Sequence, residues 1–336
     1  MLGRPFLAYQ LALLREHGVT DVILACSYRV DDVRQALGDG ERLGVRLRYV
    51  VETEPLGTGG GVRNAADLAR GTVFVLNGDV LTDADLTAMR RWHESRGSRT
   101  TIFLMPVADP RAYGLVECDD RGRLTRFREK PDAAETLTTN TINAGVYLID
   151  ATLLARIPAG QVVSIEREFF PALIADGVPC FGWTGAAPTY WRDIGSPAAY
   201  RAAQADLLTG RIRSSLLPAG TLRDGSWLAP TARLAAGAHV AAPSVIGERV
   251  DLGARVRVGP LTVVGDDSRI EDDARVEGAI LWERVRVGRG ATLRDCIVPS
   301  DATIGPHADL GPGVVLEPRA TIPPYAKLPA DSSRAP

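Results

Sequence analysis

The chain of 336 residues lacks an excess of either charge, because 39 basic and 41 acidic residues leave a formal net charge of -2. We therefore expect neither a nucleic-acid partner nor an anionic membrane surface. Its four cysteines are far apart and show no metal-ligand spacing, which predicts buried, reduced thiols. No apolar run reaches the roughly 20 residues of a membrane helix, and no signal peptide is recognisable at the start. These absences predict a soluble, cytoplasmic protein.

Short apolar segments alternate with helical patterns up to about residue 210. Segments 22–26 and 72–76 read as buried strands, and 82–94 reads as a helix capped by Thr82 or Asp83. This alternation predicts an α/β domain with a Rossmann-like, mainly parallel sheet and helices on both faces. Segment 113–127 differs, because two alternating strands flank a turn signal and predict a hairpin.

Beyond about residue 225, an aliphatic residue recurs every six positions. The series runs through Leu228, Leu234, Val240, Ile246, Leu252, Val258, Val264, Ile270 and Val276. Its phase slips by one residue after Trp282 and again after Pro299, and we interpret each slip as a loop bulging from a corner. Glycine often follows the aliphatic residue, as expected if it relieves a corner. The pattern resembles the hexapeptide repeat of left-handed parallel β-helices and predicts such a domain.

Five motifs occur in order between residues 52 and 195, namely ETEPLGTGG, LNGD, FREKP, NAGVY and WRDIG. Asp79 directly follows a buried strand, at the sheet edge where open α/β folds bind ligands. Two facing carboxylates without a partner are costly, and a Mg²⁺ shared by Asp79 and Asp193 would remove that cost. The alternative for Asp79 is an ordinary turn at residues 77–79.

The other motifs carry groups suited to phosphates and sugar hydroxyls. Lys130 offers a point charge for phosphate, and the neighbouring Glu129 can accept hydrogen bonds from hydroxyl groups. A solvated surface pair is the alternative. Asn143 offers an amide, while Gly114 and Gly145 permit close approach of a sugar or simply allow strand packing. The glycine-rich segment 55–61 precedes a helix expected near residue 62, and it suits an anion or is a linker.

Together these motifs resemble the sugar-nucleotide pyrophosphorylases, and within them the mannose-1-phosphate guanylyltransferase branch. The resemblance implies a nucleotidyltransferase domain over 1–210, a linker over 211–226, a β-helix over 227–328 and a tail over 329–336. It implies Mg²⁺-dependent formation of GDP-mannose and pyrophosphate from GTP and mannose 1-phosphate. The β-helix further suggests a homo-oligomer.

The resemblance also implies a role for each matching residue. Asp79 and Asp193 would hold the metal and, with Lys130, form the catalytic set. The nucleotide would contact Glu52, Pro55, Gly57, Thr58 and Gly78. The sugar would contact Gly114, Glu129, Asn143 and Gly145.

The chain departs from the family at its start. The family's glycine-rich loop, GxGxRL...PKP, would precede the helix that begins near Gly3, and we expect its loss to leave a gap in the sheet. Either the true start lies upstream of Met1 or the chain is a non-catalytic, sugar-nucleotide-binding or regulatory paralogue. In both cases we expect little pyrophosphorylase activity from the 336 residues. A third alternative is a hexapeptide-type acyltransferase with His239 or His307 as the base.

Overall fold

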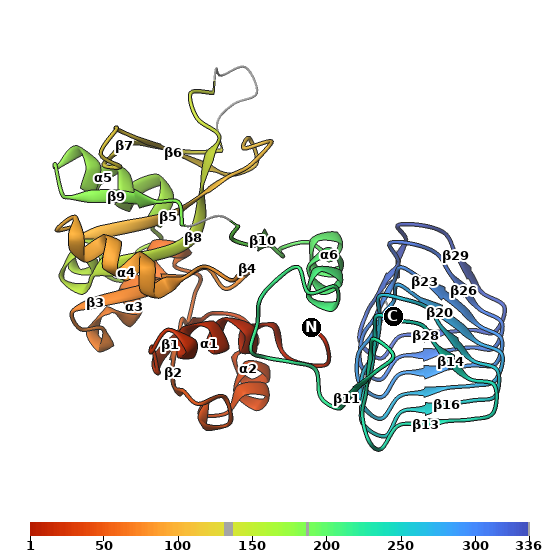
Figure 1. The fold of residues 1–336 in the computed structure, drawn as a ribbon. Coiled ribbons are helices and arrows are strands. Elements are labelled where there is room, and N and C mark those ends of the chain that lie inside the picture. Colours follow the sequence, from red (N-terminus) through yellow and green to blue (C-terminus); the bar gives the residue numbers. More distant parts are fainter. Residues whose placement is uncertain (131–136, 186–187, 335–336) are drawn as a thin grey trace. The chain divides into compact units, whose positions relative to one another are not determined.

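The computed structural model describes residues 1–130, 137–185 and 188–334, and the chain forms two compact units (Figure 1). The α/β unit comprises Leu7–Trp191, and the coil unit comprises Met1–Phe6 with Arg192–Pro336. Among the described residues, no helix is both long and apolar enough to cross a membrane. The predicted combination of a Rossmann-like α/β fold and a β-helix is confirmed.

The α/β unit contains both helices and strands. The helices are α1 (Phe6–Glu16), α2 (Val30–Leu37), η1 (Glu41–Leu43), α3 (Gly57–Ala65), η2 (Ala66–Leu68), α4 (Leu86–Ser95), η3 (Ala151–Arg156), η4 (Ile165–Phe169) and α5 (Phe170–Ala175). The strands are β1 (Asp21–Cys26), β2 (Arg46–Val51), β3 (Thr72–Leu76), β4 (Val80–Thr82), β5 (Thr100–Pro106), β6 (Gly114–Cys118), β7 (Leu124–Glu129), β8 (Thr141–Asp150) and β9 (Cys180–Trp183). β10 (Trp191–Asp193) spans the boundary with the coil unit.

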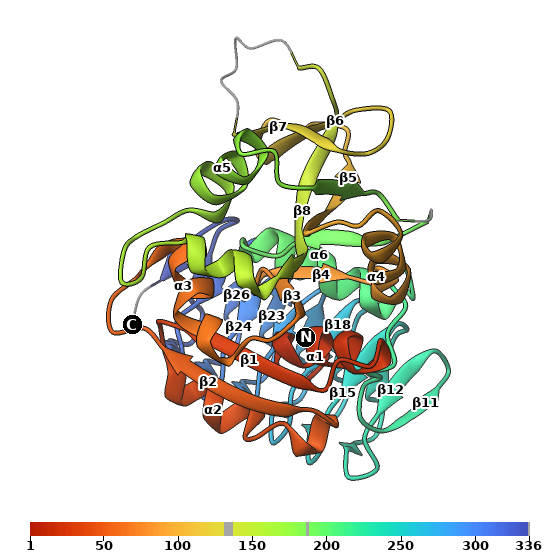
Figure 2. The same ribbon diagram turned by 90° about the vertical axis from the view of Figure 1, so that its left-hand side faces the viewer.

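The main sheet has the order β7-β6-β8-β5-β9, and β3 pairs with β8 (Figure 1 and Figure 2). β8 runs antiparallel to β3 and β5, whereas β5 runs parallel to β9. β6 and β7 form the predicted hairpin, in which the Asp119 carboxylate accepts the N–H groups of Arg121 (2.9 Å) and Arg123 (2.8 Å). In the described part of the chain, β1 pairs only with β2, and β3 pairs only with β8. Among the described residues, the β1-β2 pair and the main sheet therefore share no ladder.

Both faces of the main sheet are covered, because side chains alternate along β8. Tyr147 and Ile149 are buried with residues of η4 and α5. Val146 and Leu148 are buried on the other face, with residues of α1 and α4. On the first face, the Tyr147 ring of β8 packs against the Phe170 ring of α5, with their centroids 5.0 Å apart. Helices on both faces were predicted from the alternation of the sequence.

The N-cap predicted for α4 was wrong. The capping residue is Asp85, whose carboxylate accepts the N–H of Ala88 at 2.9 Å. The chain stays extended in β4 up to Thr82, so the helix begins later than its pattern suggested. Thr82 and Asp83 instead hold Tyr190: the Thr82 hydroxyl donates to its carbonyl and the Asp83 carboxylate accepts its N–H, both at 2.7 Å.

The coil unit begins with α6 (Pro197–Leu208), which Ser196 caps by accepting the N–H of Ala199. Short strands then form three sheets in which every pair except the antiparallel β11–β12 is parallel, the repeating pattern of a parallel β-helix. They are β11 (Thr221–Arg223), β12 (Ser226–Leu228), β13 (Arg233–Leu234), β14 (His239–Val240), β15 (Ser244–Ile246), β16 (Asp251–Leu252), β17 (Arg257–Val258), β18 (Thr262–Val264), β19 (Arg269–Ile270), β20 (Arg275–Glu277), β21 (Ile280–Leu281), β22 (Arg286–Val287), β23 (Thr292–Arg294), β24 (Ile297–Val298), β25 (Thr303–Ile304), β26 (Asp309–Leu310), β27 (Val315–Leu316), β28 (Thr321–Ile322), β29 (Lys327–Leu328) and β30 (Ser333–Arg334).

The two phase slips are shortened corners, which corrects the interpretation as bulging loops. Arg249 and Asp267 occupy equivalent corners 18 residues apart, whereas Arg284 and Asp301 are 17 apart. Register survives the loss of one residue, since Val264 still pairs with Leu281 and the inward aliphatic column continues. Sequence spacing alone does not distinguish a shortened corner from a loop that leaves the coil.

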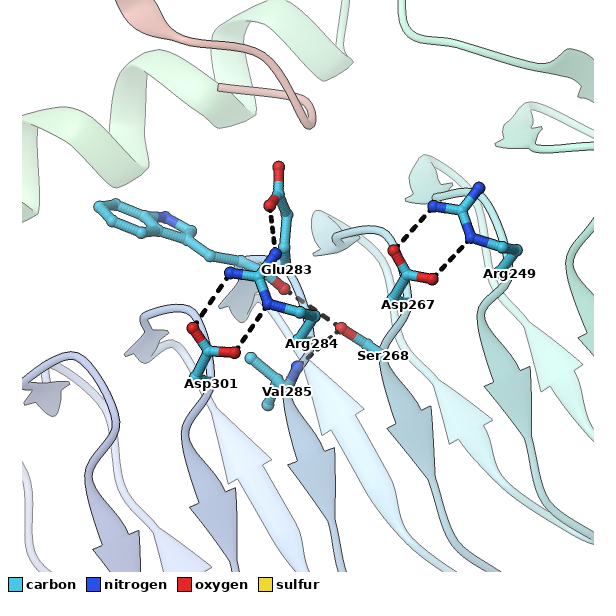
Figure 3. A network of polar contacts seen from close by, with 8 residues as sticks. Arg249, Asp267, Ser268, Glu283, Arg284, Val285 and Asp301 are labelled. Carbon is cyan, nitrogen blue, oxygen red and sulfur yellow. Dashed lines mark hydrogen bonds and ion pairs between the residues drawn. The ribbon is translucent and has the colours of Figure 1, made fainter. Parts of the chain in front are cut away.

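Many corners of the coil are occupied by charged residues, and the repeat glycines that follow the aliphatic residues do not occupy them. Arg249, Asp267, Arg284 and Asp301 all have left-handed φ values, between 54° and 65°. They form bidentate ion pairs between successive coils, with N–O distances of 2.6 and 2.7 Å for Arg249–Asp267 (Figure 3). Gly265, which follows an aliphatic residue, has no positive φ, but a Cβ there would lie 2.6 Å from the Trp282 backbone. The repeat glycines therefore allow coils to approach closely.

Both predicted ends of the coil also need correction. β11 begins within the segment 211–226 that was predicted to be a linker, and it pairs with β12 as a hairpin. β30 continues beyond 328, because Ser333 pairs with Val315 and Arg334 pairs with Leu316. Arg334 stands where the repeat would place an aliphatic residue. The backbone hydrogen-bond ladder thus extends beyond the last aliphatic position of the repeat, which had been taken as the end of the coil.

Candidate active site

The loop that carries Asp79 is held from both sides. The N–H of Asn77 donates to the Gly145 carbonyl, and the Asn77 carbonyl accepts from Nε2 of Gln10, both at 2.8 Å. The same amide nitrogen donates to the Val80 carbonyl at 2.8 Å, beyond the loop. Residues 78 and 79 are exposed between these anchors. Asp79 is therefore exposed on a backbone that is anchored on both sides.

The segment that leads to Asp193 is also anchored in the α/β unit. The Trp191 indole N–H donates to the Ala144 carbonyl at 2.8 Å, and its ring meets Tyr113 edge-on with centroids 5.4 Å apart. Asp193 itself belongs to the coil unit, where one of its carboxylate oxygens accepts the Gly195 N–H at 2.7 Å. The convergence of Asp79 and Asp193 on one cation stays a prediction.

Asn143 on β8 takes part in a partly buried hydrogen-bond network. Its side-chain N–H donates to the Tyr147 hydroxyl at 2.8 Å, and its carbonyl oxygen accepts the Gly145 N–H at 3.0 Å. Gly145 has a φ of +70°, and a Cβ there would lie 2.9 Å from the Asn77 amide. Glycine is therefore required at this position both by backbone conformation and by close approach.

Glu129 is half-buried at the end of β7, opposite Gly114 on β6. A Cβ at Gly114 would lie 2.5 Å from a Glu129 carboxylate oxygen, so the glycine makes room for that side chain. Burial and the neighbouring Glu166 carboxylate raise the pKa of Glu129, and the Lys130 cation partly offsets them. Lys130 is exposed and has a φ of 47°. Pro131 of the same motif lies outside the described residues.

Glu166, on η4, is a site residue that the sequence motifs missed. Its carboxylate accepts the hydroxyl of Thr58 at 2.7 Å and that of Ser164 at 2.9 Å. It also lies near enough to Glu129 to raise the pKa of that group. Glu166 therefore connects the glycine-rich segment with the predicted sugar residues. No sequence motif marked it, because the contact joins segments more than a hundred residues apart.

The glycine-rich segment forms the first turns of α3, which begins at Gly57 and not near Val62 as predicted. Its glycines pack on residues 161–163: a Cβ at Gly57 would lie 2.7 Å from the Val163 carbonyl oxygen, and one at Gly60 would lie 2.6 Å from that of Gln161. Side chains at these positions would clash with residues 161–163. Glycine is therefore needed here even though it is a poor helix former. The expected start was late because propensity was read without tertiary contacts.

Glu52 supports the start of α3. One carboxylate oxygen accepts the Leu56 N–H at 3.1 Å, and a Cβ at Gly61 would lie 2.5 Å from the other. Thr58 accepts the Ile165 N–H at 3.0 Å in addition to its bond with Glu166. Pro55 and Gly78, the other predicted nucleotide contacts, are exposed. The structure thus gives Glu52 and Thr58 positioning roles within this segment.

Replacing Glu129 with glutamine is expected to stabilise the fold at neutral pH. The carboxyl group has a higher pKa in the folded protein than its ordinary value of 4.5. It therefore binds protons more readily when folded, so stability falls as pH rises through the folded pKa. Glutamine removes this penalty, so thermal unfolding should show a higher midpoint than wild type at pH 7, and the difference should shrink as the pH falls toward 4.

Glu117→Gln is the matched control for this effect. Glu117 lies on the same hairpin, where its carboxylate accepts Arg128 at 2.9 Å and the Thr138 hydroxyl at 2.7 Å. Loss of that charge should lower the midpoint at neutral pH. An unchanged or lower midpoint for Glu129→Gln at pH 7 would contradict the unfavourable environment inferred for Glu129.

Comparisons with known proteins identify families for both parts of the chain. Residues 1–210 match the nucleotidyl transferase family, and residues 240–322 match the GMPPB C-terminal domain. A mannose-1-phosphate guanylyltransferase of Mycobacterium tuberculosis is 41% identical over 241 residues, which cover 70% of this chain and 66% of that protein. A UTP–glucose-1-phosphate uridylyltransferase of Synechocystis is 30% identical over 239 residues, covering 67% of this chain and 61% of that protein.

Solved structures give the same result. HddC from Yersinia pseudotuberculosis, in a structure complexed with GMP-PN, superimposes with a TM-score of 0.50 at 25% identity, covering 60% of this chain and 86% of that one. The chain spans 61–66% of the length of the two curated relatives. Because the nucleotidyl transferase match extends over more than half of its residues, and the motif residues lie on the elements described above, this chain belongs to the nucleotidyl transferase family.

Proposed function

We propose that the protein forms GDP-mannose and pyrophosphate from GTP and mannose 1-phosphate. The observation that carries this proposal is that Glu129, Glu166 and Asn143 all interact with Tyr147 in a nucleotidyl transferase domain. Carboxylates and an amide are suited to the several hydroxyls of a hexose. The guanylyltransferase relative supports mannose 1-phosphate and a guanine nucleotide as the substrates.

Each predicted residue has a role in this reaction. Lys130 holds the sugar phosphate, and Gly114 and Gly145 admit the sugar close to the backbone. Glu52, Pro55, Gly57, Thr58 and Gly78 face the nucleotide in this proposal. The sugar phosphate oxygen attacks the α-phosphorus in line and pyrophosphate leaves, so catalysis consists of positioning and charge stabilisation without a covalent enzyme intermediate.

The donor set fits a Mg²⁺ ion held by Asp79 and Asp193 together with nucleotide phosphate oxygens. Magnesium commonly takes only one or two carboxylates plus substrate phosphates, and within the described residues no cluster of three ligating side chains exists. Within the α/β unit, Tyr190 is bonded to Thr82 and Asp83, which follow Asp79 in the sequence. When bound, the ion would stabilise negative charge on the phosphates.

Release of pyrophosphate tests the proposal directly. The purified chain is incubated with mannose 1-phosphate, Mg²⁺ and either GTP or UTP, and pyrophosphate and the sugar nucleotide are measured. GDP-mannose formation supports the proposal. A preference for UTP over GTP would instead indicate a uridylyltransferase, like the Synechocystis relative. Binding of both ligands without pyrophosphate release would identify a sugar-nucleotide-binding or regulatory protein instead.

We further propose a cytoplasmic location. All four cysteines, Cys26, Cys118, Cys180 and Cys296, are free. Reduced thiols are the usual state in a compartment that glutathione keeps reducing. The proposal is tested by fractionating cells that express the tagged protein.

We propose that the homo-oligomer forms through the first coil of the β-helix. β13 and β14 pair only with the next coil, which leaves one edge of each open among the described strands. Leu234 on this edge is 41% exposed, whereas Leu328 near the other end is 4% exposed. Open strand edges beside apolar side chains favour pairing with another chain. A second copy docked on the same coil by a two-fold axis would cover both edges.

Replacing Leu234 with glutamate should weaken that association by at least tenfold, because it buries a charge between apolar coils. Sedimentation velocity over a concentration series measures the change. Val162→Glu is the control, since Val162 is 72% exposed and lies in the α/β unit. A wild-type monomer at high concentration, or equal effects of both variants, would contradict the proposed interface.

A further inference from the structure

The hydroxyl of Tyr147 is a buried polar group among aromatic rings. The side chain is fully buried on β8 and packs against Phe170. Its hydroxyl accepts the Asn143 side-chain N–H at 2.8 Å and is also hydrogen-bonded to the Asn77 side chain. Burial raises the pKa of the phenol far above its ordinary value, so the group stays neutral at physiological pH. The hydroxyl thus contacts one amide on β8 and one in the loop that follows β3.

This hydroxyl determines how the Asn143 amide is presented. Asn143 uses one N–H for Tyr147 and one carbonyl lone pair for the Gly145 N–H. An amide side chain has two N–H donors and two lone pairs. One donor and one acceptor therefore remain for a ligand, and the two bonds together fix which end of the amide is the nitrogen.

The second partner of the hydroxyl leads to the loop of Asp79. Asn77 directly precedes residues 78–79, and its backbone is bonded to Gly145 and to Gln10. Its side chain lies against Gly145, where a Cβ would be 2.9 Å from the amide nitrogen. The Tyr147 hydroxyl is thus the point at which the strand carrying Asn143 and the loop carrying Asp79 share one hydrogen-bonding group.

We propose that Tyr147 is a positioning residue for the reaction, whose hydroxyl orients the Asn143 amide toward the sugar and couples it to the loop of Asp79. This inference rests on the proposed function, because it assumes that Asn143 binds the sugar. Tyr147 touches no substrate in this proposal and acts through its two amide partners. The geometry distinguishes it from a core aromatic residue, for which phenylalanine would serve equally well.

The test measures binding of mannose 1-phosphate by isothermal titration calorimetry with the full chain and Mg²⁺. Tyr147→Phe keeps the ring and removes only the hydroxyl, and it should raise Kd about tenfold, equivalent to about 1.4 kcal/mol. Tyr49→Phe is the matched control, because it also removes a hydrogen-bonded phenol hydroxyl, which in Tyr49 donates to the Gly38 carbonyl at 2.7 Å. It should leave Kd unchanged.

A double-mutant cycle separates positioning from general loss of structure. Tyr147→Phe should add nothing to Kd in an Asn143→Ala background, because the amide that it orients is absent. Additive effects would overturn the inference, as would unchanged binding by Tyr147→Phe in a wild-type protein that binds. If Tyr147→Phe does not fold, Asn77→Ala and Asn143→Ala are combined: independent effects overturn the inference and coupled effects support it. Failure of the wild type to bind mannose 1-phosphate would overturn the proposed sugar site as well.

Discussion

Replacing Asp79 with asparagine is expected to lower Mg²⁺-dependent formation of GDP-mannose by about 10³-fold, the order seen when a charge-stabilising group is removed. Asparagine is nearly the same size, so the loop between its anchors at Gly145 and Gln10 should keep its shape. What disappears is one negative charge from the proposed pair with Asp193. The rate of pyrophosphate release is measured over a Mg²⁺ titration.

Asp31→Asn is the matched control for Asp79→Asn. Asp31 is an exposed carboxylate near the start of α2, where it pairs weakly with Arg34 at 3.6 Å. The Asp31→Asn substitution should leave both the rate of pyrophosphate release and its Mg²⁺ dependence unchanged. Near-normal activity of Asp79→Asn would exclude the proposed metal site, and unchanged circular dichroism is needed to attribute a loss to chemistry. For a chain without turnover, the same comparison is made on Mg²⁺-dependent binding of GTP.

Leu293→Ala is expected to destabilise the coil unit by about 2–5 kcal/mol, the range for deleting a buried leucine side chain. Leu293 is fully buried on the coil axis and pairs in register with Val276 on one side and Leu310 on the other. Each coil is stabilised mainly by its neighbours, so a cavity in a central coil weakens two interfaces at once. Chemical denaturation followed by circular dichroism measures the free energy of unfolding.

The control is Leu222→Ala on β11, where the side chain is 55% exposed. An exposed leucine leaves no cavity when it is shortened, so the change should stay within about 0.5 kcal/mol. Equal destabilisation by the two variants would contradict the assignment of Leu293 to a dry axial column. A separate transition for the α/β unit would further show that the two units unfold independently.

Features governed by local periodicity could be predicted from the sequence. The hexad spacing identified the β-helix because every inward position needs an aliphatic side chain, and alternation in 113–127 identified the hairpin of β6 and β7. The N-cap of α4 failed because Thr82 and Asp83 are used by Tyr190, over a hundred residues away. The local sequence pattern around Thr82 and Asp83 gives no information about these long-range hydrogen bonds to Tyr190.

The same limit applies to the candidate site. The motifs pointed to Glu129 and Asn143. They did not include Glu166, and they gave no role to the hydroxyl of Tyr147, because both roles depend on side-chain contacts seen only in the structure. The predicted start of α3 was too late because the glycines were taken as unfavourable for a helix. The structure shows that they are required there, since residues 161–163 leave no space for side chains. Corner glycines were misassigned because a sequence does not reveal whether a glycine is required by its φ or by a neighbouring coil.

The shortened corners have a consequence for how this domain changes in evolution. Since a coil of 17 or 18 residues keeps the same axial column, the deletion of a single corner residue is tolerated without refolding. Duplication of one whole coil would lengthen the rod by about 4.8 Å, the spacing of neighbouring strands, and would leave its cross-section unchanged. The β-helix can therefore act as a spacer whose length is adjustable in discrete increments.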